Sequence, residues 1–146
     1  PAPFPHHYEV SVQLEDPSHA EGILTAAEEQ PLRVGPPPQF DGRTGHQSPE
    51  DMLLAAVASC HMTTLVALAR RKAVPIKRYI SKACGTLEKT KDGLRFTSIR
   101  LHVEASTDTG REGELTSLIE QAETHCIISN ALRVKVELEI AAIRGE

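Results

Sequence analysis

The chain has 146 residues, a length that fits a single domain over residues 1–146 with one hydrophobic core. Its net charge of -4 at pH 7 provides no basic surface for nucleic acid, so we exclude nucleic-acid partners. Aromatic residues make up only 3% of the chain, which means that the core must be built from Ala, Leu, Ile and Val.

The N-terminal part predicts three strands followed by a loop. Tyr8, Val10, Val12 and Leu14 alternate with polar residues, which predicts a half-buried strand over residues 8–14. Apolar runs at residues 23–26 and 32–34 predict two more strands, and the Pro- and Gly-rich residues 35–47 predict a loop. The first ten residues lack the basic start and apolar run of a secretory signal, so we expect a cytoplasmic protein.

A long apolar helix is predicted to begin at Pro49 and to end near Ala73. Ser48 is its N-cap, and Glu50 and Asp51 complement the free N–H groups of its first turn. Polar residues interrupt its apolar run, which falls short of the roughly 20 residues that span a bilayer. We therefore expect a core helix and no membrane partner. Because it is apolar on nearly all sides, one chain can hardly cover it, and we predict a dimer.

The C-terminal part predicts a hairpin, a second helix and a final strand. Strands are expected over residues 77–88 and 94–105, joined by a turn at Asp92-Gly93. The apolar spacing from Glu114 to Cys126 predicts a second core helix, and the alternation of residues 134–140 predicts the last strand. This order of elements predicts an α+β fold.

Two cysteines occupy core-facing positions of the two predicted helices, Cys60 and Cys126. If the helices pack together, the thiols meet, although free cysteine is also a common passive core residue. A pair in contact suits peroxide reduction: one thiolate attacks the O–O bond and becomes sulfenic acid, and the second thiol condenses with it to a disulfide. Cys84, on a predicted strand, is expected to serve packing, with an alternative role as a second resolving thiol.

The reactivity of Cys60 requires a nearby cation, since an unperturbed thiol has a pKa near 8.5 and burial raises it. The helix dipole fades within the first turn, and Cys60 lies about three turns into its helix. His61 projects roughly 100° around the helix from Cys60. We therefore favour an arginine from the loop, and Arg43, close to the helix start and to Glu50, ahead of Arg33.

Two sequence runs resemble motifs of a known family. The run SPEDMLLAAVASC, residues 48–60, resembles the Pro-Glu-Glu-Leu, Ala-rich, Cys signature of the OsmC/Ohr family of organic hydroperoxide peroxidases. The run AETHCIISNAL, residues 122–132, resembles the second cysteine motif of that family, and the similarity extends over most of residues 8–142. It implies that Cys60 is the peroxidatic cysteine, Cys126 the resolving one, and Glu50 the carboxylate that orients a catalytic arginine.

The position of that arginine departs from the family pattern. In the OsmC branch an arginine commonly precedes an aromatic residue ahead of the loop, whereas Gln39 precedes Phe40 here. Arg43 or Arg33 is then the alternative. Glu50 and Cys60 are about 15 Å apart along a straight helix, so only a kink or a partner chain crossing antiparallel would bring them together.

The resemblance also implies an architecture and a reaction. The architecture is an intertwined homodimer of α+β chains, with antiparallel sheets flanking two buried central helices per chain. The reaction is the reduction of an organic hydroperoxide, with a disulfide formed in each turnover and reduced by a dithiol such as a dihydrolipoyl group, without a cofactor.

The same residues admit two other interpretations. An OsmC-like dimer with weak or no peroxidase activity could bind an apolar small molecule at its interface, and thiol reactivity separates this alternative from the peroxidase. A zinc site formed by Cys60, His61, His125 and Cys126 is disfavoured, because adjacent helical residues diverge by about 100°. No metal is therefore expected.

Overall fold

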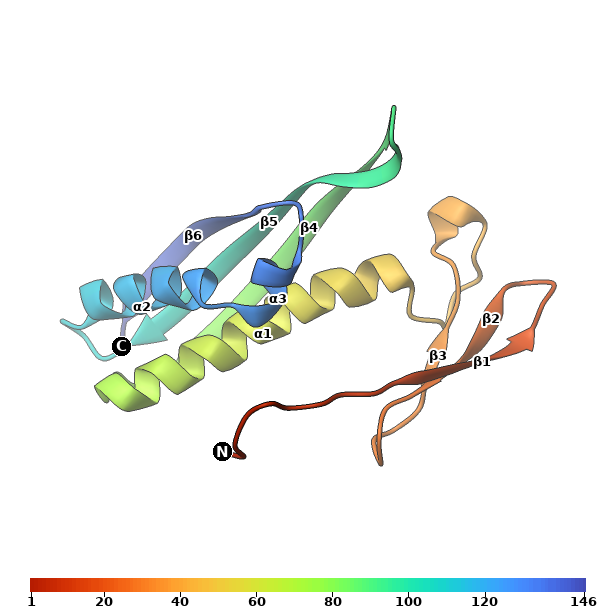
Figure 1. The fold of residues 1–146 in the computed structure, drawn as a ribbon. Coiled ribbons are helices and arrows are strands. Elements are labelled where there is room, and N and C mark those ends of the chain that lie inside the picture. Colours follow the sequence, from red (N-terminus) through yellow and green to blue (C-terminus); the bar gives the residue numbers. More distant parts are fainter. The chain divides into compact units, whose positions relative to one another are not determined.

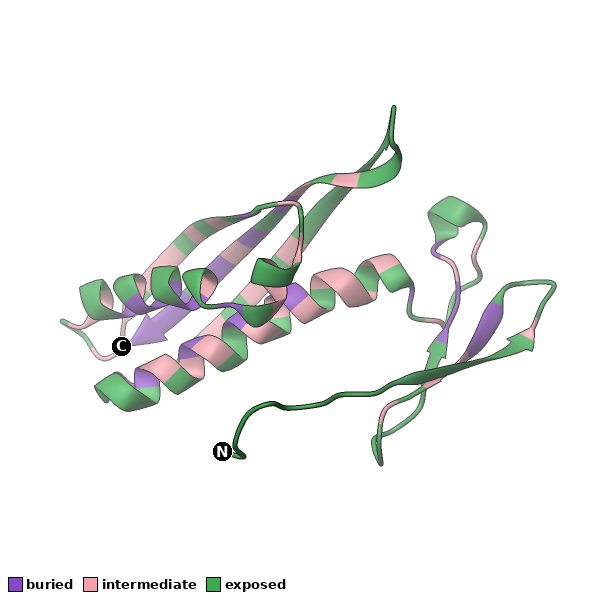
Figure 2. Ribbon diagram, in the orientation of Figure 1, coloured by how far each residue is buried: buried purple, intermediate pink, exposed green.

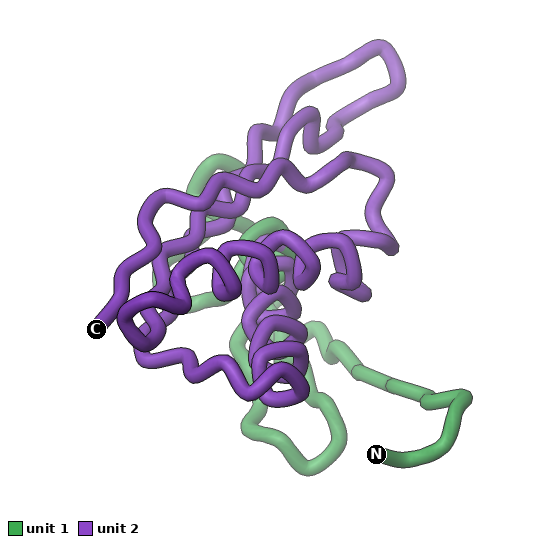
Figure 3. The backbone as a smooth tube through the Cα atoms, turned by 90° about the vertical axis from the view of Figure 1, so that its left-hand side faces the viewer, with its two compact units in different colours: residues 1–53 green, residues 54–146 purple.

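The computed structural model describes residues 1–146 as a mixed α+β fold with two three-stranded sheets and three α-helices, which confirms the predicted class (Figure 1). By its internal contacts the chain divides into two units, residues 1–53 and 54–146 (Figure 3). The expected single domain over residues 1–146 stays a prediction.

The N-terminal unit contains an antiparallel sheet in the order β1-β2-β3, with β1 at Ser11–Asp16, β2 at Glu21–Thr25 and β3 at Leu32–Val34. The first strand starts three residues later than predicted, because its pairing with β2 begins at Ser11. A short 3-10 helix, η1 at Pro38–Phe40, interrupts the segment that was expected to be wholly irregular.

One face of this sheet is apolar and uncovered. Val12 pairs with Leu24, and Leu24 pairs with Leu32, so these three side chains form a row across the sheet. Val12 and Leu14 are 63% and 59% exposed, although their alternation predicted a half-buried strand. The N-terminal unit by itself therefore leaves the apolar face of its sheet exposed.

Helix α1 spans Pro49–Lys72, with the predicted N-cap and an end next to the predicted Ala73. The backbone N–H of Asp51 donates to Ser48 Oγ over 3.0 Å. At the other end Ala73 adopts a left-handed conformation with φ of 53°, and the N–H of Val74 donates to the carbonyl of Ala69, which closes the last turn ahead of Pro75.

Helix α1 buries one stripe of side chains rather than its whole surface (Figure 2). The buried residues are Val57, His61, Leu65 and Ala69. By length and composition α1 is also the one helix of the chain that could cross a membrane. Its buried stripe nevertheless belongs to the hydrophobic core of the second unit, as expected for a core helix.

The second sheet has the order β4-β5-β6 and is mixed. Strands β4 (Arg78–Thr90) and β5 (Gly93–Thr107) form the predicted antiparallel hairpin, whereas β6 (Val136–Gly145) pairs parallel to β5. The expected antiparallel pairing thus does not extend to β6. The reason is the connection through α2 and α3, since a helical crossover returns the chain in the same direction.

Helices α2 (Glu112–Thr124) and α3 (Ile127–Ala131) lie on the same side of this sheet as α1 (Figure 1). Helix α2 begins two residues earlier than predicted and buries Leu115, Leu118, Ile119 and Ala122. The alternate residues Ile99, Leu101 and Val103 of β5 are completely buried and complete the core.

Candidate thiol site

The structure brings Cys60 and Cys126 close enough for each thiol to shift the pKa of the other, although they lie far apart in the sequence. Cys60 comes from the middle of α1 and is half-buried, whereas Cys126 is completely buried. Both cysteines are unbridged thiols in the structure. The packing of α1 against the segment between α2 and α3 creates this contact.

Cys126 does not lie in the second core helix, as its spacing had predicted. Helix α2 ends at Thr124, and Cys126 is the N-cap of α3 in an extended conformation, with φ of -67° and ψ of 115°. Its Sγ accepts the backbone N–H of Ser129 over 3.5 Å. The thiol therefore takes the place of the oxygen that usually caps a helix.

The pKa of the Cys60 thiol is lowered, which favours the nucleophilic thiolate. Burial opposes ionisation, but hydrogen bonds from the backbone of Ile128, the thiol of Cys126, the hydroxyl of Thr64 and the backbone of Ile127 outweigh it. Thr64 Oγ1 lies 3.9 Å from the sulfur. The backbone at the start of α3 thus contributes to this shift, and the expected arginine stays a prediction.

Cys126 has the opposite shift. Burial raises the pKa of its thiol, and the neighbouring Cys60 raises it further, against hydrogen bonds from Ser129 that lower it. These directions favour the thiolate at Cys60 and the protonated thiol at Cys126.

A buried polar pair adjoins this site. His61 Nδ1 accepts the hydroxyl of Tyr79 over 2.7 Å, and Nε2–H donates to the carbonyl of Ile119 over 3.0 Å. Burial lowers the pKa of His61, so the ring is neutral and its two nitrogens have these fixed roles. His61 links α1 to β4 and α2, and it is a structural residue rather than the cation for Cys60.

Arg43 is engaged within the N-terminal unit. Its Nε donates to Glu21 Oε2 over 2.9 Å, a second nitrogen donates to Glu21 Oε1, and Asp16 lies 3.5 Å away. The hydrogen bonds from Arg43 lower the pKa of Glu21, which is 5% exposed, and His46 lies 3.5 Å from the same carboxylate. Arg43 therefore holds the loop after β3 onto β2.

The remaining predicted residues lie elsewhere. Glu50 is in the first turn of α1, where its Oε1 is buried without a hydrogen-bond donor. Arg33 lies on β3. Cys84 is exposed on β4, so its expected packing role is wrong for this chain. No group of three or more His, Cys, Asp or Glu side chains is arranged to hold a metal ion.

Sequence reasoning missed two contributors to the site. Thr64 stands one helical turn after Cys60, and that spacing is a signal that could have identified it. The N–H groups of Ile127 and Ile128 belong to the backbone, so no residue type signals them.

Comparisons with known proteins agree with this fold. Residues 41–141 match the family described as OsmC-like protein. An uncharacterized protein of Bacillus subtilis, YmaD, is 29% identical over 110 residues, 73% of each chain. An OsmC-like protein of unknown function from Vibrio cholerae has a TM-score of 0.82 at 18% identity, covering 92% of this chain and 99% of the other. The organic hydroperoxide resistance protein OhrB of Bacillus subtilis has a TM-score of 0.68 at 23% identity, covering 92% and 98%.

Proposed function

We propose that this chain, which belongs to the OsmC-like protein family, is a thiol-dependent peroxidase that reduces organic hydroperoxides. The observation that carries the proposal is that two unbridged thiols, on α1 and at the start of α3, lie close enough to shift each other's pKa in opposite directions. Cys60 is the thiolate nucleophile and Cys126 is the protonated partner. A two-cysteine peroxidase requires this difference, because only the thiolate attacks the peroxide.

In the first step the Cys60 thiolate attacks the terminal oxygen of the hydroperoxide. An S–O bond forms and the O–O bond breaks, and the alkoxide leaves and takes up a proton to become the alcohol. Cys60 is oxidised to sulfenic acid while the peroxide is reduced by two electrons. The backbone of Ile127 and Ile128 lowers the pKa of Cys60 and so favours the thiolate before the attack.

In the second step Cys126 loses its proton and attacks the sulfur of the Cys60 sulfenic acid. An S–S bond forms, and hydroxide leaves and takes up a proton to become water. A dithiol such as a dihydrolipoyl group then reduces this disulfide by thiol exchange and is itself oxidised to a disulfide.

The working unit in this proposal is a homodimer. Helix α1 is continuous from Pro49 to Lys72, so Glu50 and Cys60 stay about 15 Å apart along its axis. An antiparallel partner helix would bring Glu50 of one copy toward Cys60 of the other. The unpaired buried oxygen of Glu50 would then be available to a guanidinium group, and Arg43 would exchange its bonds to Glu21 for a hydrogen bond to Glu50. Slower oxidation of Cys60 in Arg43→Ala, but not in Arg33→Ala, would support that role.

The test is to treat the reduced protein with one equivalent of an alkyl hydroperoxide. Two thiols should be consumed per chain, and peptide mapping should find a cross-link between Cys60 and Cys126. Cys126→Ser should stop at sulfenic acid and proceed to sulfinic acid with excess oxidant. Cys60→Ser should not react, and the control Cys84→Ser should behave as the wild type.

Cysteines that stay reduced under these conditions would overturn the proposal, as would an unchanged oxidation rate in Cys60→Ser. Binding of an apolar small molecule by such an unreactive protein would instead support the alternative of a non-enzymatic dimer.

A further inference from the structure

The proposed disulfide can form only if Cys126 loses its proton, and its surroundings oppose that loss. Cys126 is completely buried, and burial raises the pKa of its thiol. Tyr79 lies close enough for the charge of Cys126 to raise its pKa, but it is no proton acceptor, because its hydroxyl is itself protonated and donates to His61. The attack by Cys126 therefore requires another base within reach of its thiol.

Ser129 has the side chain that is placed to reach this thiol. Cys126 is the N-cap of α3, Ser129 is the third residue of the helix, and the backbone N–H of Ser129 donates to the sulfur over 3.5 Å. A side chain at this third position characteristically turns back toward the cap residue. The Ser129 hydroxyl is buried without a hydrogen-bond partner and lies close enough to lower the pKa of Cys126. It is therefore available to exchange a proton with the thiol.

Glu123, in the last turn of α2, supplies a carboxylate within reach of the same hydroxyl. Its backbone carbonyl accepts the N–H of Cys126 over 3.2 Å, which fixes the two residues next to each other. Its Oε2 is buried without a hydrogen-bond partner, and the Ser129 side chain lies close enough to lower its pKa. Burial has the larger effect and raises the pKa of Glu123, which makes this carboxylate a stronger base than an exposed one.

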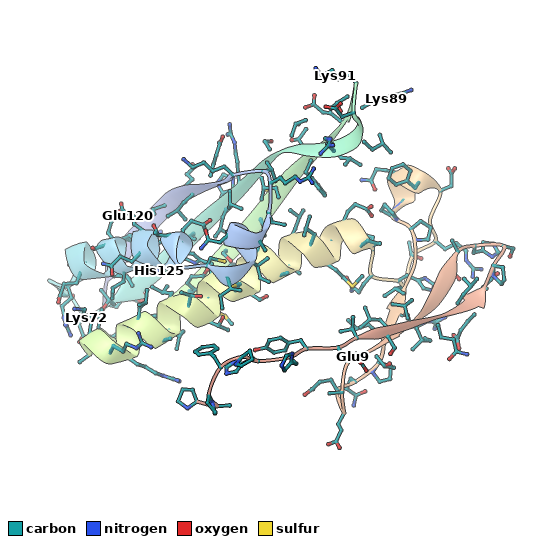
Figure 4. All side chains as sticks on the ribbon, in the orientation of Figure 1. Glu9, Lys72, Lys89, Lys91, Glu120 and His125 are labelled. Carbon is teal, nitrogen blue, oxygen red and sulfur yellow. The ribbon has the colours of Figure 1, made fainter.

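A groove of about 730 Å³ connects both residues to solvent. Glu123 and Ser129 line it, and its other charged lining residues are Glu120, Arg133, Lys135 and Glu137. Two of these four are acidic and two are basic, and none forms a salt bridge with Glu123. Glu120 lies on α2, and His125, the neighbour of Cys126, lies at its end (Figure 4). The Glu123 carboxylate is thus not neutralised by an ion pair.

We propose that Ser129 and Glu123 form a proton relay that activates Cys126 as it closes the disulfide. The inference rests on the proposed function and adds the residues that serve its second step. Two buried oxygens without partners, one from α2 and one from α3, beside a buried thiol are the arrangement that such a relay requires.

The relay moves one proton in each closure. The S–H bond of Cys126 breaks and its proton goes to Ser129 Oγ, while the hydroxyl proton of Ser129 goes to the Glu123 carboxylate. The electron pair left on the Cys126 sulfur forms the S–S bond, and the oxygen of the Cys60 sulfenic acid leaves as hydroxide. Glu123 then gives its proton to water in the groove, and the hydroxide takes up a proton to become water.

The experiment measures the closure step separately from the first attack. In a Cys84→Ser background, one equivalent of dithiobisnitrobenzoate should release one thionitrobenzoate when Cys60 attacks and a second when Cys126 closes the disulfide. Ser129→Ala and Glu123→Gln should slow the second release about a hundredfold, the scale of a general base, and leave the first unchanged. Glu120→Gln, which removes a carboxylate of the same groove, is the matched control and should behave as wild type.

The pH dependence of the second release distinguishes a relay from a structural role. With Glu123 as the base, the wild-type rate should change little between about pH 6.5 and 8. In Glu123→Gln the reaction depends on the small thiolate fraction of Cys126, so its rate should rise about tenfold per pH unit. A variant that is slowed but keeps the pH profile of the wild type would overturn the relay, as would equal slowing in Glu120→Gln.

The same variants separate the relay from the peroxidase. With one equivalent of an alkyl hydroperoxide, Ser129→Ala and Glu123→Gln should accumulate Cys60 sulfenic acid, which dimedone captures. A protein that consumes no hydroperoxide but shows the expected second release of thionitrobenzoate would retain the relay and reject the peroxidase. An active peroxidase whose disulfide closes at the wild-type rate in both variants would reject the relay alone.

Discussion

The Thr64 hydroxyl, 3.9 Å from the Cys60 sulfur, offers a direct test of the thiol environment. Thr64→Val removes the hydroxyl while keeping the shape of the side chain, so the pKa of Cys60 should rise. The measurement is the pH dependence of Cys60 alkylation in a Cys84→Ser background. Thr63→Val is the matched control, because the Thr63 hydroxyl donates to the carbonyl of Cys60 rather than to its thiol. An equal effect of both substitutions would contradict this assignment.

His61 should contribute strongly to stability, because it is completely buried and both ring nitrogens are bonded. His61→Ala leaves a cavity and removes the hydrogen-bond partner of both the Tyr79 hydroxyl and the Ile119 carbonyl. We expect a loss of about 3 kcal/mol in the free energy of unfolding, measured with urea. Ser59→Ala, on the exposed side of α1, should cost far less.

His61 should also make stability depend on pH. Burial lowers its pKa in the folded chain below the ordinary value of 6.5. The unfolded chain therefore binds the proton more readily, so this part of the stability is complete above pH 6.5 and is lost as the pH falls toward the folded pKa. The slope of unfolding free energy between pH 7 and 5 should be shallower in His61→Gln. An identical slope in the wild type and in His61→Gln would show that other histidines account for the pH dependence of stability.

Individual residues of the site could be predicted from the sequence where their side chains lie on a regular helix. Cys60, Thr64 and Glu50 fall at helical spacings that the capped start of α1 fixes. The source of the Cys60 pKa shift could not be predicted, because backbone N–H groups of α3 provide it. Arg43 stays the predicted cation, and its ion pair with Glu21, 22 positions earlier in the chain, could not be predicted from the sequence.

At the scale of elements, the first turn of α3 should set the reactivity of Cys60. Ile127→Pro removes one N–H group from the thiol, and the pKa of Cys60 should therefore rise. Proline suits this first helical position, and the extended Cys126 before it has the conformation that proline requires. Ile127→Ala keeps the N–H group and should leave the pKa unchanged. A similar rise in both variants would point to the side chain, which is 76% exposed.

The elements themselves were largely predictable, because their signals are local. Ser48, Pro49 and Pro75 delimit α1, and Asp92-Gly93 marks the hairpin. The break between α2 and α3 was not predictable, since the apolar spacing continues through Cys126 and a thiol is an unusual cap. The parallel direction of β6 depends on the crossover through α2 and α3. The alternation of apolar residues predicts a strand but not its direction.

At the scale of the whole molecule, we expect a dimer that covers the apolar row Val12, Leu24 and Leu32. Val12→Lys should weaken association, because a charge would be buried in that row. Gln13→Lys, on the opposite face of β1, should leave it intact. Sedimentation velocity at micromolar concentration would measure both. A monomeric wild-type protein would reject the dimer and leave the exposed row unexplained.

The contact between Cys60 and Cys126 also ties conformational stability to redox state. A disulfide between them would close a loop of roughly 67 residues and restrict the unfolded ensemble by about 4 kcal/mol in chain-entropy terms. The oxidised chain should therefore resist denaturant more than the reduced one. In the proposed cycle the oxidised chain, before it meets a reductant, would be the more stable form. Each reduction of the disulfide would return the chain to the less stable form. The concentration of dithiol would then affect the resistance of the chain to unfolding as well as its rate of turnover.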